Sequence, residues 1–195
     1  MYYVMTCTSP PEQDTALLHY DPDDPLRSWA SGDKFVDDEL APDFLRPPPE
    51  PVRAEIMPGY AGAMLEFWNA PLPLMTKRLY KALVEAGVTN IDTYAAEIVD
   101  PQTGTVNTDY VAFNIVGKIS AADLAKTQVA PTSTEQMISM DIDSLAIDEA
   151  KARGALLFRL AESVNAIIVH ESVKKHIEAQ GIDTLTFIEP QDWAG

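Results

Sequence analysis

A chain of 195 residues, 46% hydrophobic and 23% charged, has the composition of an ordinary globular protein and is long enough to bury a sizeable core without disulfides. Its single cysteine, Cys7, excludes an intramolecular disulfide and fits a reducing compartment. Its net charge of −16 argues against nucleic acid and against an anionic membrane as partners, because both are polyanions that attract Lys and Arg. The same charge would attract a basic protein, although acidity can also serve solubility alone.

The start of the sequence, MYYVMTCTSPP, has neither the positive charge nor the apolar run of a signal peptide. No window of the chain reaches the roughly 18 uninterrupted apolar residues that a membrane-spanning helix needs. We therefore expect a cytoplasmic protein without a membrane segment.

The first expected element is a strand at Met1–Val4, and an irregular stretch follows over residues 9–54. Consecutive prolines at positions 47–49 favour an extended, semi-rigid backbone there. One short helical turn is expected near Leu26–Trp29. We predict a single domain of residues 1–195, on which residues 9–54 pack as an extended arm.

The middle of the chain predicts one helix among several strands. Weak alternation over Ala63–Trp68 indicates a strand. The clearest helix is Leu74–Ala86, whose apolar residues recur at spacings of three and four, and Gly87 is placed to end it. The β-branched and aromatic stretches Ile91–Val99 and Tyr110–Val116 predict an antiparallel pair. One face of the second strand is expected to carry Val111, Phe113 and Ile115, and the other Tyr110, Ala112 and Asn114.

The last third predicts shorter elements. We expect a loop at Val129–Glu135, strands at Met137–Met140, Ala155–Leu160, Ala166–Val169 and Leu185–Ile188, a helical turn before Gly154, and a helix at Glu171–Gln180 ended by Gly181. The fold class is therefore α+β: a mostly antiparallel β-sheet with two principal helices and an irregular, acidic, Pro-rich N-terminal arm.

Few residues suggest chemistry. Cys7 could serve as a nucleophile, but no catalytic signature surrounds it, and a cysteine after a first strand is commonly structural. His170 and His176 are six residues apart, so their rings diverge on a helix and do not form a metal site. Asp141 and Asp143 lack the further ligands of a calcium loop. We expect no enzyme activity, no cofactor and no metal.

The N-terminal arm holds the candidates for partner binding. Residues 21–43 carry eight carboxylates but only Arg27 and Lys34 as cations. Trp29 has two alternatives: packing in the core, which we favour, or anchoring a protein interface, where Trp is enriched. The candidate residues are Asp21, Asp23, Asp24, Trp29, Asp37, Asp38 and Glu39.

Several phrases follow one another along the chain: the tyrosine-rich first strand, the Trp-bearing acidic arm, PLPLMTKRLYKALVEAGV, DYVAFNIVG, ISMDIDSLAID, LFRL, IIVHESV and LTFIEP. Their order resembles that of immunity protein family 11 of bacterial polymorphic toxin systems. The resemblance covers most of the chain, and the long proline-rich arm and the high acidity depart from the family pattern. It implies a protein that binds and neutralises a cognate toxin effector, and it supplies no catalytic residue.

Two other interpretations stay open at this point. The chain could be a structural or adaptor subunit that wraps its arm around a partner, or an enzyme that uses Cys7 or His170. The expected partner is a toxin protein, basic in charge, and self-association is left open. The sequence does not identify the toxin.

Overall fold

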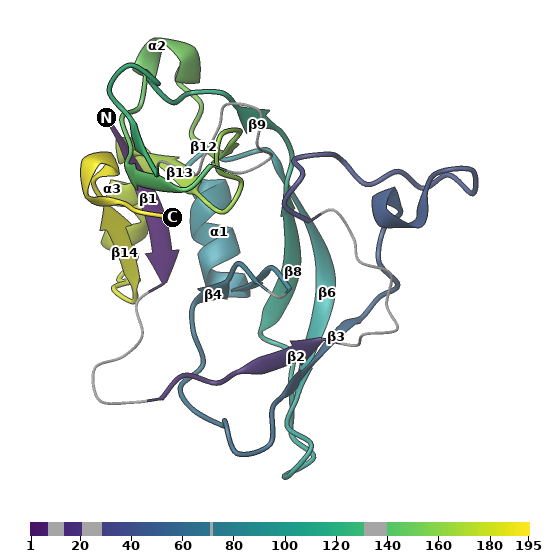
Figure 1. Cartoon of the computed structure of the whole chain (residues 1–195). Helices are drawn as coiled ribbons and strands as arrows, with labels where there is room; N and C mark the ends of the chain where they lie inside the picture. The colour runs from purple at the N-terminus through teal and green to yellow at the C-terminus, as the bar shows by residue number, and fades with distance from the viewer. Residues whose placement is uncertain (8–13, 21–28, 71, 131–139) are drawn as a thin grey trace.

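The computed structural model describes residues 1–7, 14–20, 29–70, 72–130 and 140–195. Its two main sheets face each other across a central helix (Figure 1). The first sheet has five strands in the order β14 (Leu185–Ile188), β1 (Tyr2–Cys7), β13 (Ile167–His170), β12 (Leu157–Leu160) and β9 (Lys118–Ile119). The second sheet has the order β2 (Leu18–Tyr20), β3 (Val52–Ile56), β6 (Ile91–Val99), β8 (Tyr110–Ile115), β5 (Leu74–Thr76) and β4 (Phe67–Trp68), with β7 (Val106–Asn107) beside β6.

The remaining elements are short, except for two helices. They are α1 (Lys77–Glu85), α2 (Glu149–Ala152), α3 (Glu171–Ala179), the strand pair β10 (Gln128–Val129) and β11 (Ile142–Ser144), and the 3-10 turns η1 (Asp43–Leu45) and η2 (Pro190–Asp192). Of the strand pairs that the structure describes, β3–β6 and β9–β12 are parallel and the others antiparallel. The predicted α+β class is therefore confirmed.

The central core lies between the two sheets and is closed by α1 and α3. Leu79 and Leu83 of α1 and Val173 and Ile177 of α3 are fully buried in it. These residues stand four apart on each helix, so each helix presents one apolar stripe. The outer face of each sheet packs against one further apolar cluster. Strand β8 of the second sheet and strands β12 and β13 of the first are thus buried along nearly their whole length.

The strand β8 shows how the sequence pattern produces this arrangement. Val111, Phe113 and Ile115 point into the central core, as predicted, whereas Tyr110 and Ala112 face the outer cluster. The strand pairs with β6 over five residues in antiparallel register, as the hairpin prediction required. The helix prediction over Glu171–Gln180 and the strand prediction over Leu185–Ile188 are also confirmed.

Two predicted elements were wrong in their bounds. The helix expected from Leu74 begins only at Lys77, because Leu74–Thr76 pairs with β8 as strand β5. The Thr76 hydroxyl then accepts the Leu79 N–H at 3.1 Å and caps the helix. The strand expected over Ala63–Trp68 is confined to Phe67–Trp68, the edge strand β4.

Other sequence predictions meet the described residues only in part. Residues 9–54, expected to be irregular, contain strand β2, whose partner β3 begins at Val52. The helical turn near Leu26–Trp29, the loop at Val129–Glu135 and the strand at Met137–Met140 fall largely on residues outside the described ranges. The observed strand in the last region is β11, which begins at Ile142. That residues 1–195 form one domain stays a prediction.

Candidate partner-binding site

A closed loop projects from the second sheet between residues 36 and 45. The Val36 N–H donates to the Leu45 carbonyl at 2.8 Å, so the two ends of the loop meet. Loops of this kind, closed at the base and held by their own contacts, are frequently functional. Figure 1 shows this segment extending away from both sheets. We call residues 36–45 the acidic loop.

Arg46 lies at the base of the acidic loop and braces it from inside. Its Nε donates to the Ala41 carbonyl at 2.8 Å, and its Nη2 donates to the Glu39 carbonyl. Its Nη1 also lies 3.3 Å from an Asp43 carboxylate oxygen. The Arg46 side chain therefore contacts two backbone carbonyls and one carboxylate of the loop. All of these contacts come from within the chain itself.

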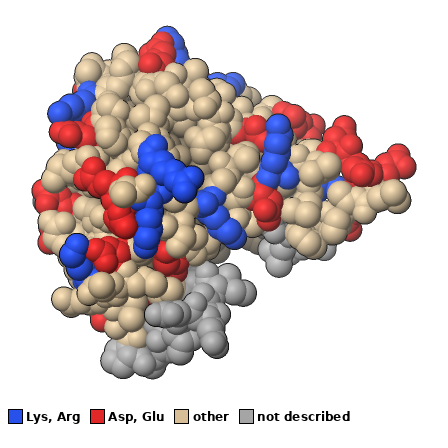
Figure 2. Space-filling model, turned by 90° about the horizontal axis from the view of Figure 1, so that it is seen from above, with Lys and Arg blue, Asp and Glu red and all other residues tan. Residues whose placement is uncertain are grey.

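The acidic loop exposes two kinds of side chain that protein interfaces use. Carboxylates come from Asp37, Asp38, Glu39 and Asp43, and apolar surface comes from Val36, Leu40 and Phe44. Leu40 is 92% exposed, the highest value among the exposed large hydrophobic residues that the structure describes. Figure 2 shows Asp and Glu side chains gathered over this protrusion.

The root of the acidic loop is anchored in the outer core of the second sheet. Trp29 and Phe35 are 6% and 5% exposed, and their rings meet edge to face at a centroid distance of 5.0 Å. Both rings also contact Tyr94 of β6 at 5.8 Å. The Asn114 side chain on β8 donates to the Asp33 carbonyl at 2.7 Å. The arm is therefore packed where it leaves the sheet.

The predicted binding residues separate into three groups. Asp37, Asp38 and Glu39 lie together on the exposed acidic loop. Of the two alternatives for Trp29, the structure shows packing: its side chain is buried beneath the loop and does not lie on the loop surface. Asp21, Asp23 and Asp24 lie outside the described residues. Leu40 and Arg46 were not predicted as site residues from the sequence. Leu40 could have been recognised because it is an apolar residue directly after three carboxylates.

The residues considered for chemistry are far apart. Tyr2 pairs with His170 across β1 and β13, and Cys7 is five residues further along β1, about 17 Å away at the rise of a strand. Burial raises the pKa of the Cys7 thiol, which opposes formation of the nucleophilic thiolate. The His170 ring caps α3 by accepting the Ser172 N–H at 3.2 Å. Both residues have structural roles here.

No group of three or more His, Cys, Asp or Glu that could hold a metal ion exists in the part of the chain that the structure describes. Within the same ranges, no helix has the length and apolar character to cross a bilayer.

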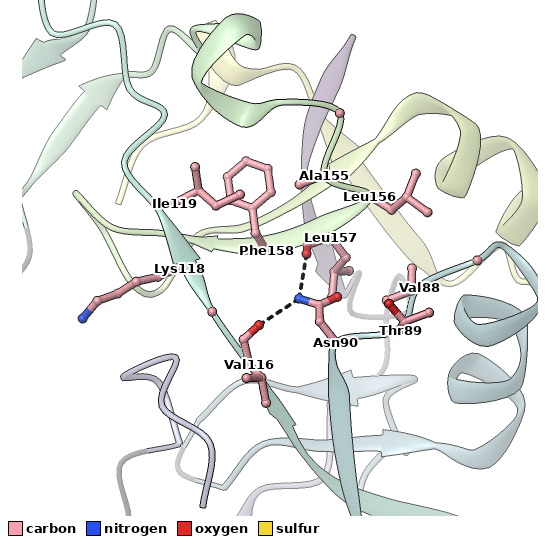
Figure 3. Close-up of a pocket in the computed structure, with 13 residues that line it drawn as sticks. Val88, Thr89, Asn90, Val116, Lys118, Ile119, Ala155, Leu156, Leu157 and Phe158 are labelled. Carbon is pink, nitrogen blue, oxygen red and sulfur yellow. Dashed lines mark hydrogen bonds between the residues drawn. The ribbon is translucent and has the colours of Figure 1, made fainter.

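A cleft of about 380 Å³ lies between the sheets, beside the end of α1 (Figure 3). Asn90 reaches across it, and its side-chain amide donates to the Val116 carbonyl at 3.0 Å and to the Leu157 carbonyl at 3.1 Å. These two carbonyls belong to the ends of different sheets. Among the described residues that line the cleft, Lys118 alone carries a charge. Asn90 therefore links the two sheets across the cleft. Few polar side chains line the cleft that could bind a small-molecule ligand.

Three buried charged residues were not predicted from the sequence: Glu66, Arg159 and Glu162, whose carboxylate accepts the Ser120 hydroxyl. Glu66 is 4% exposed, and its carboxylate binds Arg78, Thr76 and Thr184. Arg159 in the centre of β12 is fully buried, and its one hydrogen bond among the described residues joins Nη1 to the Val164 carbonyl at 2.9 Å. All three lie within the fold, and none belongs to the acidic loop.

Loops on a rigid scaffold frequently carry binding residues, and charged side chains belong to the polar rim of protein interfaces. A comparison with family models finds a match to the Immunity protein family (Imm11) over residues 36–192. The chain belongs to this family, as its resemblance predicted. The match begins at the first residue of the acidic loop. A search of curated proteins finds no match.

Membership in this family makes the chain an immunity protein, which neutralises a toxin. The function predicted from the sequence is therefore confirmed at this level. The family also indicates a role that is not enzymatic.

Proposed function

We propose that this immunity protein neutralises its cognate toxin by direct contact through the acidic loop, in the cytoplasm of the producing cell and without a catalytic step. The observation that carries this proposal is the coincidence of exposed carboxylates and the exposed Leu40 on one loop that Arg46 holds in shape. A toxin with a basic surface, such as a face that handles nucleic acid, is the matching class of partner.

The charges and the apolar residues of the loop would contribute differently. Carboxylates on a rim raise the association rate more than they strengthen the final complex. The dominant binding energy usually comes from a few side chains that enter a pocket of the partner. Leu40 is placed for that role, because its side chain already stands free of its own fold. We therefore assign steering to Asp37, Asp38 and Glu39, and anchoring to Leu40.

The order of the loop before binding supports the same proposal. Ordering a flexible segment on binding costs free energy that is subtracted from the affinity. The Val36–Leu45 closure and the contacts of Arg46 remove part of this cost. A stable interface buries about 1,600 Å² in total, so surfaces beside the loop would also take part.

The test combines charge reversal with a control of equal charge. In the variant D37K/D38K/E39K the acidic loop changes sign. In the control E55K/D109K/D183K, three exposed carboxylates elsewhere are reversed, so the net charge of the protein changes equally. The partner tested is the product of the gene adjacent to that of this protein. Binding is measured by biolayer interferometry at low and at physiological salt, and protection by co-expression of toxin and variant in a host cell.

We expect the loop variant to lose protection and to bind at least roughly tenfold more weakly than the control, a difference of about 1.4 kcal/mol. General steering by net charge would weaken both variants alike. If the loop variant binds the toxin as tightly as the control does, the acidic loop is not the contact surface. If the wild-type protein neither binds nor protects against the adjacent toxin, direct neutralisation of that partner is wrong.

A further inference from the structure

A hollow of about 560 Å³ lies between β9 and α2, and the described residues that line it include cations and no carboxylate. The lining residues are Lys118, Ile119, Ser120, Ala150, Lys151, Ala152 and Arg153. We call this hollow the cationic groove. Three cations in one groove are unexpected in a protein with 30 acidic and only 14 basic residues. Their grouping concentrates positive potential on a concave surface.

Two of the three cations have their charge available. Lys118 and Arg153 are exposed, and neither makes a hydrogen bond or ion pair with its side chain to another residue in the described part of the chain. Lys151 is held in place, since its Nζ donates to the Ala122 carbonyl at 3.1 Å and lies 4.0 Å from Asp148. Elsewhere most long cationic side chains meet a carboxylate, as Lys174 and Lys175 do on α3.

The backbone at Arg153 adds a second, independent sign. Arg153 ends α2 with φ of 51°, and it is the one residue other than glycine with a left-handed φ among those described. This conformation is unfavourable for a residue with a Cβ atom, and strained residues cluster at functional sites. A glycine could adopt this conformation without strain, but it would leave the edge of the groove without the charged side chain that Arg153 provides.

The cationic groove adjoins the root of the acidic loop. The Gly117 N–H, next to Lys118, donates to the Gly32 carbonyl at 2.7 Å. The contact is so close that a Cβ on Gly32 would lie 3.1 Å from backbone atoms of Gly117 and Lys118. The acidic loop begins four residues later, which spans at most about 14 Å of chain. Figure 2 shows Asp and Glu side chains over the protrusion, and both Lys and Arg and further Asp and Glu side chains across the rest of the same face.

We propose that the cationic groove binds an acidic segment of the same toxin whose basic surface meets the acidic loop, so that the interface has two poles of opposite sign. This inference rests on the proposed function. An extended polyanion such as a nucleic acid fits less well, because its phosphates would continue into the acidic loop. A short carboxylate-bearing stretch of protein satisfies the groove and leaves the loop to the basic surface beside it.

Two variants that change the net charge equally can test this proposal, because only one of them alters the groove. The variant K118E/R153E makes the protein more acidic, and so does the control K77E/K81E, which reverses two exposed lysines on α1. A basic toxin should associate with both at least as fast as with the wild type if net charge alone matters. Binding of the toxin encoded beside this gene is measured for both variants and for the loop variant D37K/D38K/E39K.

We expect K118E/R153E to bind roughly tenfold more weakly than K77E/K81E at physiological salt, and the gap to shrink at high salt. Circular dichroism and thermal unfolding of both variants check that the fold is intact. If the loop variant is impaired but K118E/R153E matches its control, the inference about the groove is wrong and the proposed function stands. If D37K/D38K/E39K also binds the toxin as tightly as its control E55K/D109K/D183K, the inference about the groove and the proposed role of the acidic loop are both wrong.

Discussion

The carboxylate of Glu66 holds the guanidinium of Arg78 through paired contacts, with Nη2 and Oε2 only 2.6 Å apart and Nε 2.9 Å from Oε1. Glu66 precedes strand β4, whereas Arg78 lies in the first turn of α1. The same carboxylate accepts the hydroxyls of Thr76 and Thr184, so it also reaches the segment before β14. One buried acid therefore connects both sheets with the start of the central helix.

This connection predicts an acid-sensitive contribution to stability. Burial raises the pKa of Glu66, but the hydrogen bonds from Arg78, Thr76 and Thr184 outweigh it and hold the pKa below its usual value of 4.5. A carboxyl with a lowered pKa stabilises the fold above the unfolded pKa and loses this contribution as the pH falls through the folded pKa. We expect E66Q to lower the free energy of unfolding by about 1–3 kcal/mol at pH 7.

Urea unfolding between pH 7 and pH 3 checks this prediction. The difference between wild type and E66Q should narrow below about pH 4.5, because the Glu66 carboxyl then binds a proton in the unfolded state before it does so in the folded state. The control E55Q removes an exposed carboxylate and should run parallel to the wild type. A constant difference between E66Q and wild type across this range would contradict the assigned role of Glu66.

Arg159 predicts the opposite behaviour, a gain in stability when its charge is removed. Desolvation lowers the pKa of its guanidinium to about 10, and Nε and Nη2 lack hydrogen-bond partners among the described residues. Replacing a buried charge by an apolar side chain of similar length is often neutral or stabilising. We expect R159M to be as stable as the wild type or more stable at pH 7 by up to about 2 kcal/mol.

The pH dependence separates this charge effect from a gain in packing. The native state of the wild type loses the Arg159 proton near pH 10, before the unfolded state does, so its penalty shrinks as the pH rises further. The advantage of R159M should therefore decrease between pH 9 and pH 11 in urea unfolding. K118M, at the exposed neighbouring position in register on β9, should change stability by no more than about 0.5 kcal/mol. A strongly destabilised R159M would show that Arg159 has a partner that matters.

The sequence predicted elements well where the pattern is local. Ile91–Val99 and Leu185–Ile188 are rich in β-branched and aromatic residues, and the helix from Glu171 has a cap, an apolar stripe and a terminal glycine close to its own segment. Leu74–Thr76 became a strand because β8 lies beside it, and an apolar pair before a helix looks the same in either state. That decision is made by a distant segment and is invisible in the local pattern.

The candidate site was predictable in composition but not in shape. The excess of carboxylates marked Asp37, Asp38 and Glu39, because charge can be counted. The loop is closed by the Val36–Leu45 backbone hydrogen bond and braced by Arg46, and hydrogen bonds to backbone carbonyls leave no signature in the sequence. The burial of Glu66 and Arg159 was missed for a related reason: a charged residue within a strand pattern is normally placed on the solvent face.

Leu40 predicts a separation of binding from stability. Its side chain is 92% exposed, so truncation removes almost no contact within the fold. We expect L40A to leave the free energy of unfolding within about 0.5 kcal/mol of wild type and to weaken toxin binding by roughly tenfold, as for an interface anchor. V84A, which shortens an apolar side chain on α1 that is 48% exposed, is the control and should leave toxin binding unchanged. Equal affinity of L40A and wild type would remove Leu40 from the interface.

Arg46 offers a test of whether the shape of the acidic loop matters apart from its charge. In R46Q the guanidinium that fixes Glu39, Ala41 and Asp43 is lost, and the loop becomes more acidic by one charge. If attraction to a basic toxin depended on charge alone, R46Q would associate faster and bind more tightly. If the braced shape matters, the loop must be ordered on binding, and affinity falls despite the added negative charge.

We expect the second outcome, with faster amide hydrogen exchange in residues 36–45 of the free protein and a faster dissociation rate from the toxin. K34Q removes a neighbouring exposed cation without touching these contacts, and it isolates the effect of charge. R46Q should therefore bind several-fold more weakly than K34Q. Equal binding of the two variants, together with unchanged exchange in the loop, would show that Arg46 does not shape the site.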